Sequence, residues 1–281
     1  MALETRTYQK QNNLKFGKLL KASLSDIYSS RFLAYQFAAR DIKAQYRQSF
    51  LGIFWAFITP LVTALIWIVL NNSGTIRLSD TGVPYPVYAF TGTLIWSIIT
   101  ESINSPMLST NAAKSILTKI NFPKEALVIS GIYKLLFNSG IKVLLLVGFV
   151  LIYNVGFHTS ALLFPLTILG AILFGTTVGL FLTPIGLLYK DVGKVITFGL
   201  RFLMYATPVV YAIPDEGIIR TVMEYNPLTS IILTSRDLLT GMEPDFITQF
   251  LIVIGCCVPL LFIALVFYRI SNPIIVERLS A

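Results

Sequence analysis

The distribution of apolar and polar residues changes abruptly near residue 50. Residues 40–49 are basic and amphipathic, whereas residues 50–70 contain no charged side chain. A helix of that length measures about 31 Å, which matches the hydrocarbon core of a bilayer. The pattern therefore predicts a helix on the membrane surface that leads directly into a first membrane span. Pro60, near the centre of this span, is expected to kink it.

Five further apolar runs predict the remaining spans. They occupy residues 87–102, 127–153, 161–189, 195–213 and 247–268. The second and third of these runs are longer than one crossing requires, and Pro208 is expected to kink the span at 195–213. With six spans, both ends of the chain lie on the same side of the membrane.

The segment between the fifth and sixth spans holds two shorter, half-apolar pieces. Residues 217–225 and 228–240 flank Asn226 and Pro227, and neither piece is long enough to cross a bilayer. Backbone at membrane depth has to be helical or buried in protein. We therefore expect a re-entrant helical hairpin that serves as an outer gate, with a cap lying flat on the membrane as the alternative.

The N-terminal part is expected to start as a loosely held basic tail over residues 1–24 and to form a helix from Ser29 or Ser30 to about residue 49. Apolar side chains recur along this helix at spacings of three and four: Tyr28, Phe32, Tyr35, Ala39, Ile42 and Tyr46. Arg40, Lys43 and Arg47 lie on another face, where they suit headgroups or a partner protein.

These elements predict an all-α membrane protein. It has six transmembrane helices, an N-terminal amphipathic interfacial helix and the re-entrant hairpin between spans five and six. The expected domains are the cytoplasmic tail and interfacial helix (1–49), the transmembrane domain (50–268) and a cytoplasmic C-terminal tail (269–281).

Composition supports the membrane class and sets its orientation. Charged residues make up 13% of the chain, about half the share in soluble proteins, and the mean hydropathy is +0.73. The net charge of +8 comes mainly from one set of loops, which carries 16 Lys and Arg residues against three in the other set. The positive-inside rule makes the first set, with both termini, cytoplasmic. We therefore interpret the basic charge as topology and expect no nucleic-acid partner.

Ionisable residues within the spans are the next candidates for function. Lys134, Asn138 and Lys142 share one helical face, and Glu101 and Arg201 lie near span ends. These residues, together with Trp55 and Trp96, are candidates for a polar substrate path. The alternative is that the long side chains reach the membrane surface and the tryptophans belong to the interfacial belt.

Motifs for catalysis or metal binding are absent from the sequence. It has no GxxxxGK[ST] run, so we expect no ATP site of its own, and no HExxH or GxSxG pattern. Cys256 and Cys257 are adjacent in an apolar run and His158 is the only histidine, so no disulfide or metal site is expected. The chain is predicted not to be an enzyme.

Four separated stretches are similar to the ABC-2 type permeases that export polysaccharides. They read YRQSFLGIFWAFITPL, ILTKINFPKEAL, LLYKDVGKVITFGLRFLMYATPVVYAIP and EYNPLTSII. They stand in the family's order, within a resemblance that covers residues 31–268. The resemblance implies a homodimer with two copies of a separate ABC ATPase, which binds ATP and Mg²⁺. It also implies export of a lipid-linked polysaccharide, O-antigen foremost, across a bacterial inner membrane.

The same resemblance assigns roles to residues of this chain. Ten residues are predicted to contact the ATPase: Arg40, Lys43, Arg47, Lys119, Asn121, Phe122, Pro123, Lys124, Lys190 and Asp191. Tyr225, Asn226 and Pro227 are predicted to form the outer gate. We also expect Lys134, Lys142 and Arg201 to meet the pyrophosphate of a lipid carrier.

Three alternative functions stay open at this point. A capsule or teichoic acid exporter belongs to the same family. A flippase or channel for lipid-linked sugars that works without ATP needs no partner ATPase. A membrane glycosyltransferase would need acidic pairs at the membrane face, and the cytoplasmic loops are poor in acids.

Overall fold

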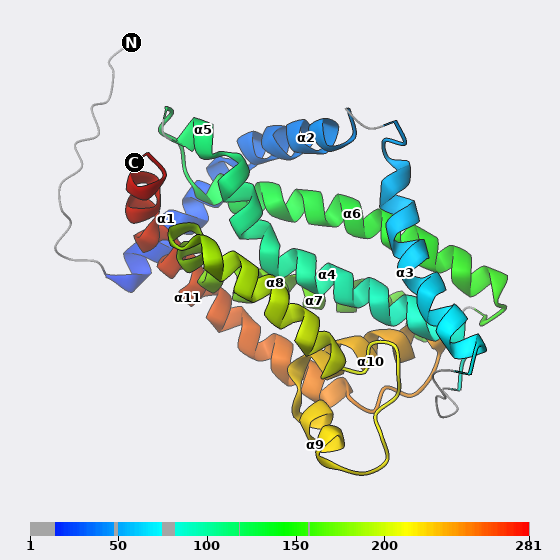
Figure 1. The fold of residues 1–281 in the computed structure, drawn as a ribbon. Helices are drawn as coiled ribbons and strands as arrows, with labels where there is room; N and C mark the ends of the chain where they lie inside the picture. The colour runs from blue at the N-terminus through cyan, green and yellow to red at the C-terminus, as the bar shows by residue number, and fades with distance from the viewer. Residues whose placement is uncertain (1–14, 48–49, 75–81, 118, 157, 281) are drawn as a thin grey trace, which may run out of the picture.

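The computed structural model describes residues 15–47, 50–74, 82–117, 119–156 and 158–280. These residues form helices and no strand (Figure 1). In chain order the helices are α1 (Phe16–Ser29), α2 (Arg31–Arg47), α3 (Phe54–Asn72), α4 (Tyr85–Ala112), α5 (Lys114–Leu117), α6 (Glu125–Ile152), the short 3₁₀ helix η1 (Thr159–Leu163), α7 (Phe164–Leu188), α8 (Lys190–Tyr205), α9 (Ile218–Tyr225), α10 (Pro227–Thr240) and α11 (Ile247–Ser280).

Helices α4 and α7 form the centre of the molecule. They pack closely because glycines of α7 face the backbone of α4. A Cβ atom on Gly179 would lie 2.3 Å from the carbonyl oxygen of Ile103, and one on Gly175 would lie 2.4 Å from the Cβ of Ser102. Small residues at such contacts let two membrane helices approach each other without a cavity.

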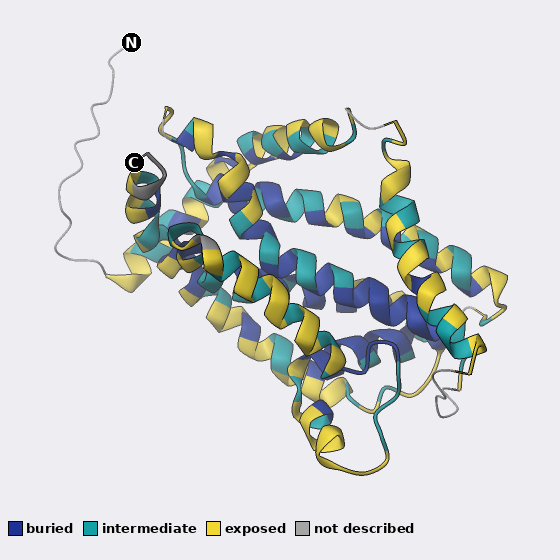
Figure 2. Cartoon of the chain, in the orientation of Figure 1, coloured by how far each residue is buried: buried dark blue, intermediate teal, exposed yellow. Residues whose placement is uncertain are grey.

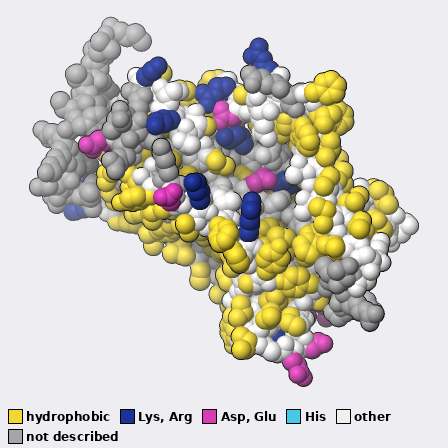
Figure 3. Space-filling model, viewed as in Figure 1, with side chains coloured by type: hydrophobic (Ala, Val, Ile, Leu, Met, Phe, Trp, Pro, Cys, Tyr) yellow, Lys and Arg dark blue, Asp and Glu magenta, His cyan; other side chains and the backbone are white. Residues whose placement is uncertain are grey.

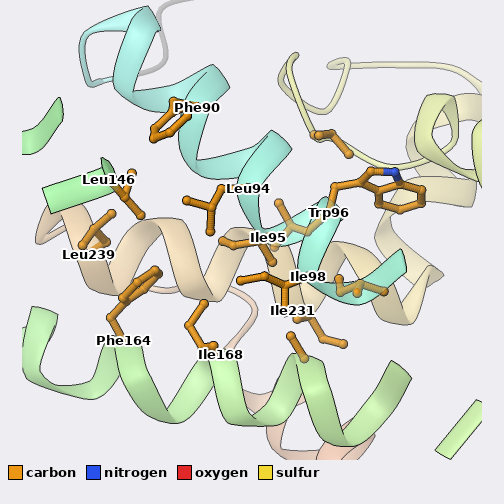
Figure 4. Packing of buried hydrophobic residues seen from close by; sticks show 14 of the residues in the cluster. Phe90, Leu94, Ile95, Trp96, Ile98, Leu146, Phe164, Ile168, Ile231 and Leu239 are labelled. Atoms are coloured by element: carbon orange, nitrogen blue, oxygen red, sulfur yellow. The ribbon is translucent and has the colours of Figure 1, made fainter. Parts of the chain in front are cut away.

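The main apolar core surrounds this contact. It joins Phe90, Leu94 and Ile95 of α4 with Phe164 of α7 and Ile231 of α10 in one cluster (Figure 4). Because α10 contributes to the same core, the segment between α8 and α11 is part of the folded bundle. Figure 2 shows α4, α7 and α10 mostly buried, whereas α3, α8 and α9 carry large exposed areas.

Polar residues in α4 are compatible with this central position. Thr91, Ser102 and Thr110 are buried, and each donates a hydrogen bond to the carbonyl oxygen four residues earlier, at 2.7–2.8 Å. Such bonds satisfy the hydroxyl groups within the helix. These three hydroxyls are therefore both buried and satisfied within the folded chain.

Four helical segments of the described residues are long and apolar enough to cross a membrane. They are Phe54–Asn72, Glu125–Ile152, Thr159–Leu188 and Ile247–Glu277. They correspond to the predicted first, third, fourth and sixth spans, so four of the six predicted spans have this support. The second span corresponds to α4.

The predicted fifth span is wrong at both ends. Helix α8 runs from Lys190 to Tyr205, so the charged stretch 190–194 is its first turn and not a loop. Tyr189, at the N-cap position before the helix, has an extended backbone, and Asp191 lies in the first turn, where a negative charge is favourable. Pro208 lies in the turn after the helix and therefore cannot kink it.

Other predicted boundaries also change. Residues 104–112, predicted as loop, continue α4, and residues 269–280, predicted as a tail, continue α11. Residues 16–24, predicted as loose tail, belong to α1. The predicted interfacial helix corresponds to α2, residues 31–47.

An ion cluster holds α1 and the C-terminal part of α11 against the start of α6. Arg269 of α11 contacts Asp26 of α1 at 2.7 Å and Glu125 at the start of α6 at 2.6 Å. Ser23 of α1 donates to the same Glu125 oxygen at 3.1 Å. Residues from three distant parts of the chain meet here, and their spacing along the sequence gives no sign of it.

The charges are unevenly distributed along the molecule. In Figure 3 the Lys and Arg side chains gather in the half that carries α2 and α5, with acidic side chains among them, whereas apolar side chains dominate the other half and further acidic side chains lie at the tip near α9. The excess of Lys and Arg at one end agrees with the one-sided placement of basic loops expected from the sequence, and the assignment of that end to the cytoplasm stays a prediction.

Candidate substrate path and coupling surface

Three cavities adjoin one another around α4. The largest has a volume of about 920 Å³ and lies among α2, α4, α6 and α8. A cavity of about 490 Å³ between α4 and α8 shares Thr100, Asn104 and Arg201 with it. A cavity of about 310 Å³ among α2, α3, α4 and α6 shares Glu101 and Asn138 with it.

The seven residues predicted for the substrate path all line these cavities. The lining of the largest includes Glu101, Lys134, Asn138 and Arg201. Trp96 lies at the second cavity, and Trp55 and Lys142 lie at the third. The structure therefore brings the predicted set together, although it comes from four helices.

Two of the predicted cations are paired with carboxylates. Lys142, which is buried, forms an ion pair with Glu101. The Nζ atom of Lys134 lies 2.9 Å from Oδ2 of Asp41. Burial of Asp41 would raise its pKa, but hydrogen bonds and charge from Lys134 and Arg40 outweigh this effect and lower the pKa below its ordinary value.

Sequence reasoning missed Asp41. It stands between Arg40 and Lys43 on a basic helix, and a lone acid in such a stretch is a weak signal of an ion-pair partner. It pairs with Arg40 as well, at 2.7 Å. The carboxylate thus holds α2 against α6.

Arg201 differs from the two paired lysines. It lies on α8, seven residues after Lys194, so the two cations are on one helical face, and both line the largest cavity. Within the described part of the chain, neither forms an ion pair with a carboxylate. Lys194 was not among the predicted path residues.

The predicted coupling loop, residues 119–124 with five of the residues expected to contact the ATPase, packs against α2. The rings of Phe122 and Phe37 have centroids 5.5 Å apart, and the ammonium of Lys124 lies 4.6 Å from the centroid of Phe122. Burial is the larger influence on Lys124 and lowers its pKa. Arg40 lies 5.2 Å from the ring centroid of Phe37. Phe122 therefore joins the loop to α2 as one unit.

The other predicted coupling residues surround this unit. Those on the surface are Arg40, Lys43, Arg47, Lys119, Asn121 and Asp191, and Pro123 is half-buried. Lys190 begins α8, and its side chain lies outside the described residues. Contact with an ATPase stays a prediction for all of them.

The predicted gate residues form the joint between α9 and α10. Tyr225 ends α9 and is 84% exposed. The side chain of Asn226 accepts a hydrogen bond from the backbone of Leu228 at 3.0 Å and so caps α10. Its amide also donates to Ala206 O at 3.0 Å and Thr207 Oγ1 at 2.9 Å. Pro227 occupies the first turn of α10, where proline is favoured.

Arg236 is a second residue that sequence reasoning missed. It is 1% exposed, and its guanidinium lies 3.5 Å from the ring centroid of Tyr88. One nitrogen donates to Val209 O at 2.6 Å. A Cβ on Gly92 would lie 1.8 Å from that oxygen. In the sequence, a single arginine in a half-apolar segment is indistinguishable from an ordinary loop charge.

Comparison with known proteins establishes the family. A family model described as ABC-2 type transporter matches residues 33–240. The chain belongs to this family. It is 26% identical over 209 residues to the O-antigen export system permease protein RfbA of Myxococcus xanthus, which covers 73% of this chain and 79% of that protein.

Two Klebsiella pneumoniae proteins with the same name are also similar. One is 27% identical and the other 24% identical, each over 204 residues that cover 71% of this chain and 76% of the relative. The matched residues 33–240 include α3 to α10 and nearly all of α2. They therefore contain all three cavities and the predicted coupling loop.

Proposed function

We propose that this ABC-2 family chain is the membrane subunit of an ATP-driven exporter of a lipid-linked polysaccharide, O-antigen foremost. The polymer moves from the cytoplasmic side across the bacterial inner membrane, and both chain termini are cytoplasmic. The observation that carries the proposal is the meeting of all seven predicted path residues at adjoining cavities. The three relatives named O-antigen export permeases support the choice of polymer.

Energy enters through a partner in this proposal. The sequence has no P-loop, so ATP and Mg²⁺ belong to two copies of a separate ABC ATPase. Their closure moves the unit formed by α2 and the loop at 119–124. The contact between Phe37 and Phe122 and the ion pair between Asp41 and Lys134 then transmit the movement to α6 and the largest cavity.

Two copies of the chain form the complete transporter. Apolar side chains that lack cover in the single chain support this assembly: on α3 Val62, Leu65, Ile66 and Val69, and on α8 Val195, Phe198, Phe202 and Tyr205. Part of this surface faces lipid, and part faces the second copy around a shared channel. The α9–α10 segment acts as the outer gate and as a re-entrant hairpin in the complete six-span arrangement.

Arg201 and Lys194 are the cations that meet the phosphate groups of the lipid carrier. Lys134 and Lys142 were proposed for the same task, but each has a carboxylate partner. These two lysines bind phosphate only after each has left its carboxylate partner. Export that is unchanged when both Arg201 and Lys194 are replaced by Gln, at equal protein level, would remove this part of the proposal.

The decisive experiment combines purification with an export assay. The chain is tagged, expressed with the ATPase encoded beside it, and extracted in detergent. In the host, the gene that encodes the chain is deleted, and the polysaccharide is measured on the cell surface and inside the cell. We expect a stoichiometric complex, loss of surface polymer and internal accumulation of its lipid-linked form.

Each alternative has its own result. A chain that purifies without any ATPase and still supports transport is a flippase that works without ATP. Chemical analysis of the accumulated polymer separates O-antigen from capsule and teichoic acid. A polymer that is not synthesised at all in the deletion strain would indicate a glycosyltransferase and would contradict the transport function.

A further inference from the structure

The smallest of the three cavities has chemistry of its own. It is enclosed by α2, α3, α4 and α6 and has a volume of about 310 Å³. This is the lower end of the range for small-molecule sites, about 300–1,000 Å³. It opens next to the largest cavity at Gln45, Glu101 and Asn138, which line both. One ring of a larger chain can therefore enter it while the rest stays in the large cavity.

Two polar atoms in this wall are buried and have no hydrogen-bond partner. They are the hydroxyl of Tyr46 and Oε2 of Glu101, and both residues line the cavity. Burial, and then the charge of Glu101, raise the pKa of Tyr46, so its hydroxyl stays protonated and is a donor. A buried polar group without a partner is unfavourable, so a ligand that supplies partners to both atoms gains affinity.

The remaining polar groups extend this pattern. The hydroxyls of Thr63, Thr93 and Ser97 donate to carbonyl oxygens of their own helices at 2.8–3.0 Å. Their oxygen lone pairs are thus left as acceptors. The amides of Gln45 and Asn138 offer both donors and acceptors. A ligand whose hydroxyls donate and accept at once matches this lining.

An aromatic surface and the charge balance narrow the ligand class. Trp55 is about half exposed and lines the cavity. The apolar C–H face of a sugar ring packs on an indole plane. The single cation, Lys142, is neutralised by Glu101, so the described lining carries no net charge. This favours a neutral, hydroxyl-rich ring over an anionic lipid headgroup.

We propose that this cavity is a saccharide subsite that holds one sugar ring of the polymer against Trp55. The hydroxyl of Tyr46 donates to a sugar oxygen, and Oε2 of Glu101 accepts from a sugar hydroxyl. The inference rests on the proposed polysaccharide transport and adds a site within a single copy of the chain, beside the shared channel.

The test uses the purified complex with Trp67 and Trp96 replaced by Phe, so that Trp55 is the only tryptophan of this chain. In the control complex Trp55 is also replaced by Phe, and its signal, which comes from the ATPase, is subtracted. The probes are the methyl pyranosides of glucose, mannose, galactose and rhamnose, with sorbitol as an open-chain control. We expect a saturable change in Trp55 emission with at least one pyranoside and none with sorbitol. A small ligand of this kind binds with a Kd of the order of 1 mM.

Matched variants locate the binding. Tyr46→Phe removes only a hydroxyl without a partner, so the fold is retained, and we expect the Kd to rise about tenfold, equivalent to about 1.4 kcal/mol. Tyr133→Phe is the control, since Tyr133 lies on α6 and does not line any of the three cavities. Its Kd should equal that of the parent.

Several results would overturn the subsite. One is a Trp55 emission that does not saturate with any of the four pyranosides up to about a hundred times the expected Kd. The others are an equal change in emission with sorbitol and a Kd that is unchanged by Tyr46→Phe. A response to phosphatidylglycerol vesicles without sugar would assign the cavity to lipid. Export is measured separately: normal export without sugar binding removes only the subsite, whereas a chain that supports no export removes the proposed function.

Discussion

The guanidinium of Arg236 lies 3.5 Å from the centroid of the Tyr88 ring, and both residues are buried. The same guanidinium donates to Val209 O at 2.6 Å and Pro208 O at 3.3 Å. One side chain of α10 thus holds α4 and the turn after α8 together. The Tyr88 hydroxyl adds a bond to Tyr211 O at 3.1 Å.

Replacement of Arg236 by Met should release the turn after α8. A desolvated cation–π contact contributes about 2 kcal/mol, and the two carbonyl groups lose their donor. Removing the buried charge offsets part of this loss, so we expect local opening without global unfolding. Val210, which is 2% exposed, is replaced by Cys in a chain without Cys256 and Cys257, and its labelling by a maleimide is measured.

The maleimide should label the cysteine at position 210 slowly in the protein that keeps Arg236 and quickly in the Arg236→Met variant. Arg220→Met is the control, because Arg220 is an exposed arginine on α9 that pairs with Glu224 at 2.7 Å. Equal labelling of both variants would mean that Arg236 does not anchor the turn.

The approach of α7 to α4 predicts opposite effects for two glycine substitutions. A Cβ on Gly179 would clash with the backbone of Ile103, whereas nothing lies within 4 Å of one on Gly140. We expect Gly179→Ala to destabilise the protein by about 1–3 kcal/mol through overpacking. Gly140→Ala should stabilise it by about 0.5–1 kcal/mol, because it restores helix propensity. Thermal unfolding in detergent measures both, and two equal shifts would contradict the close contact.

The ion pair between Asp41 and Lys134 predicts a stability difference that depends on pH. The pKa of Asp41 is lowered in the folded chain. A lowered carboxyl pKa stabilises the fold above the unfolded value of about 3.9 and loses this effect as the pH falls through the folded value. Asp41→Asn should therefore lower Tm at pH 7, by the equivalent of about 1 kcal/mol or less.

Below about pH 4 the melting temperatures of the parent and Asp41→Asn should converge. Glu216→Gln serves as a control, since Glu216 is exposed and forms no ion pair within the described residues. A difference between parent and Asp41→Asn that stays constant from pH 7 to pH 3 would exclude this ion pair as its source.

The contact between Phe122 and Phe37 predicts how ATP hydrolysis is coupled to export. Phe122→Ala removes an aromatic pair of about 0.5–1.5 kcal/mol and the ring beneath Lys124. We expect the complex to assemble and to hydrolyse ATP while export falls, because the loop no longer moves with α2. Pro123→Ala should have a smaller effect in the same direction.

Ile120→Ala provides the comparison for the coupling loop. Ile120 is 59% exposed and makes no ring contact with α2, so export should stay near the parent level. If Phe122→Ala and Ile120→Ala have equal export, the loop is not coupled through this aromatic contact.

The sequence determined the class of the protein and much of its local structure. Long apolar runs can be stable only in lipid or in a core, so the helical membrane fold and four apolar spans follow from composition and length. The division of residues 217–240 into two short helices follows from Pro227 and the cap residue Asn226. Periodicity also placed Lys134, Asn138 and Lys142 on one face.

Tertiary packing decided the rest. Asp41 and Lys134 are 93 positions apart in the sequence, and Glu101 and Lys142 are 41 positions apart. No local sequence pattern predicts which of these charges form ion pairs. Arg236 is buried because α4 and the turn after α8 close around it. The position at which α8 ends, Tyr205, and the packing of α1 likewise depend on contacts between residues that are far apart in the sequence. Sequence periodicity describes one helix at a time, whereas a cavity or an ion pair belongs to several helices at once.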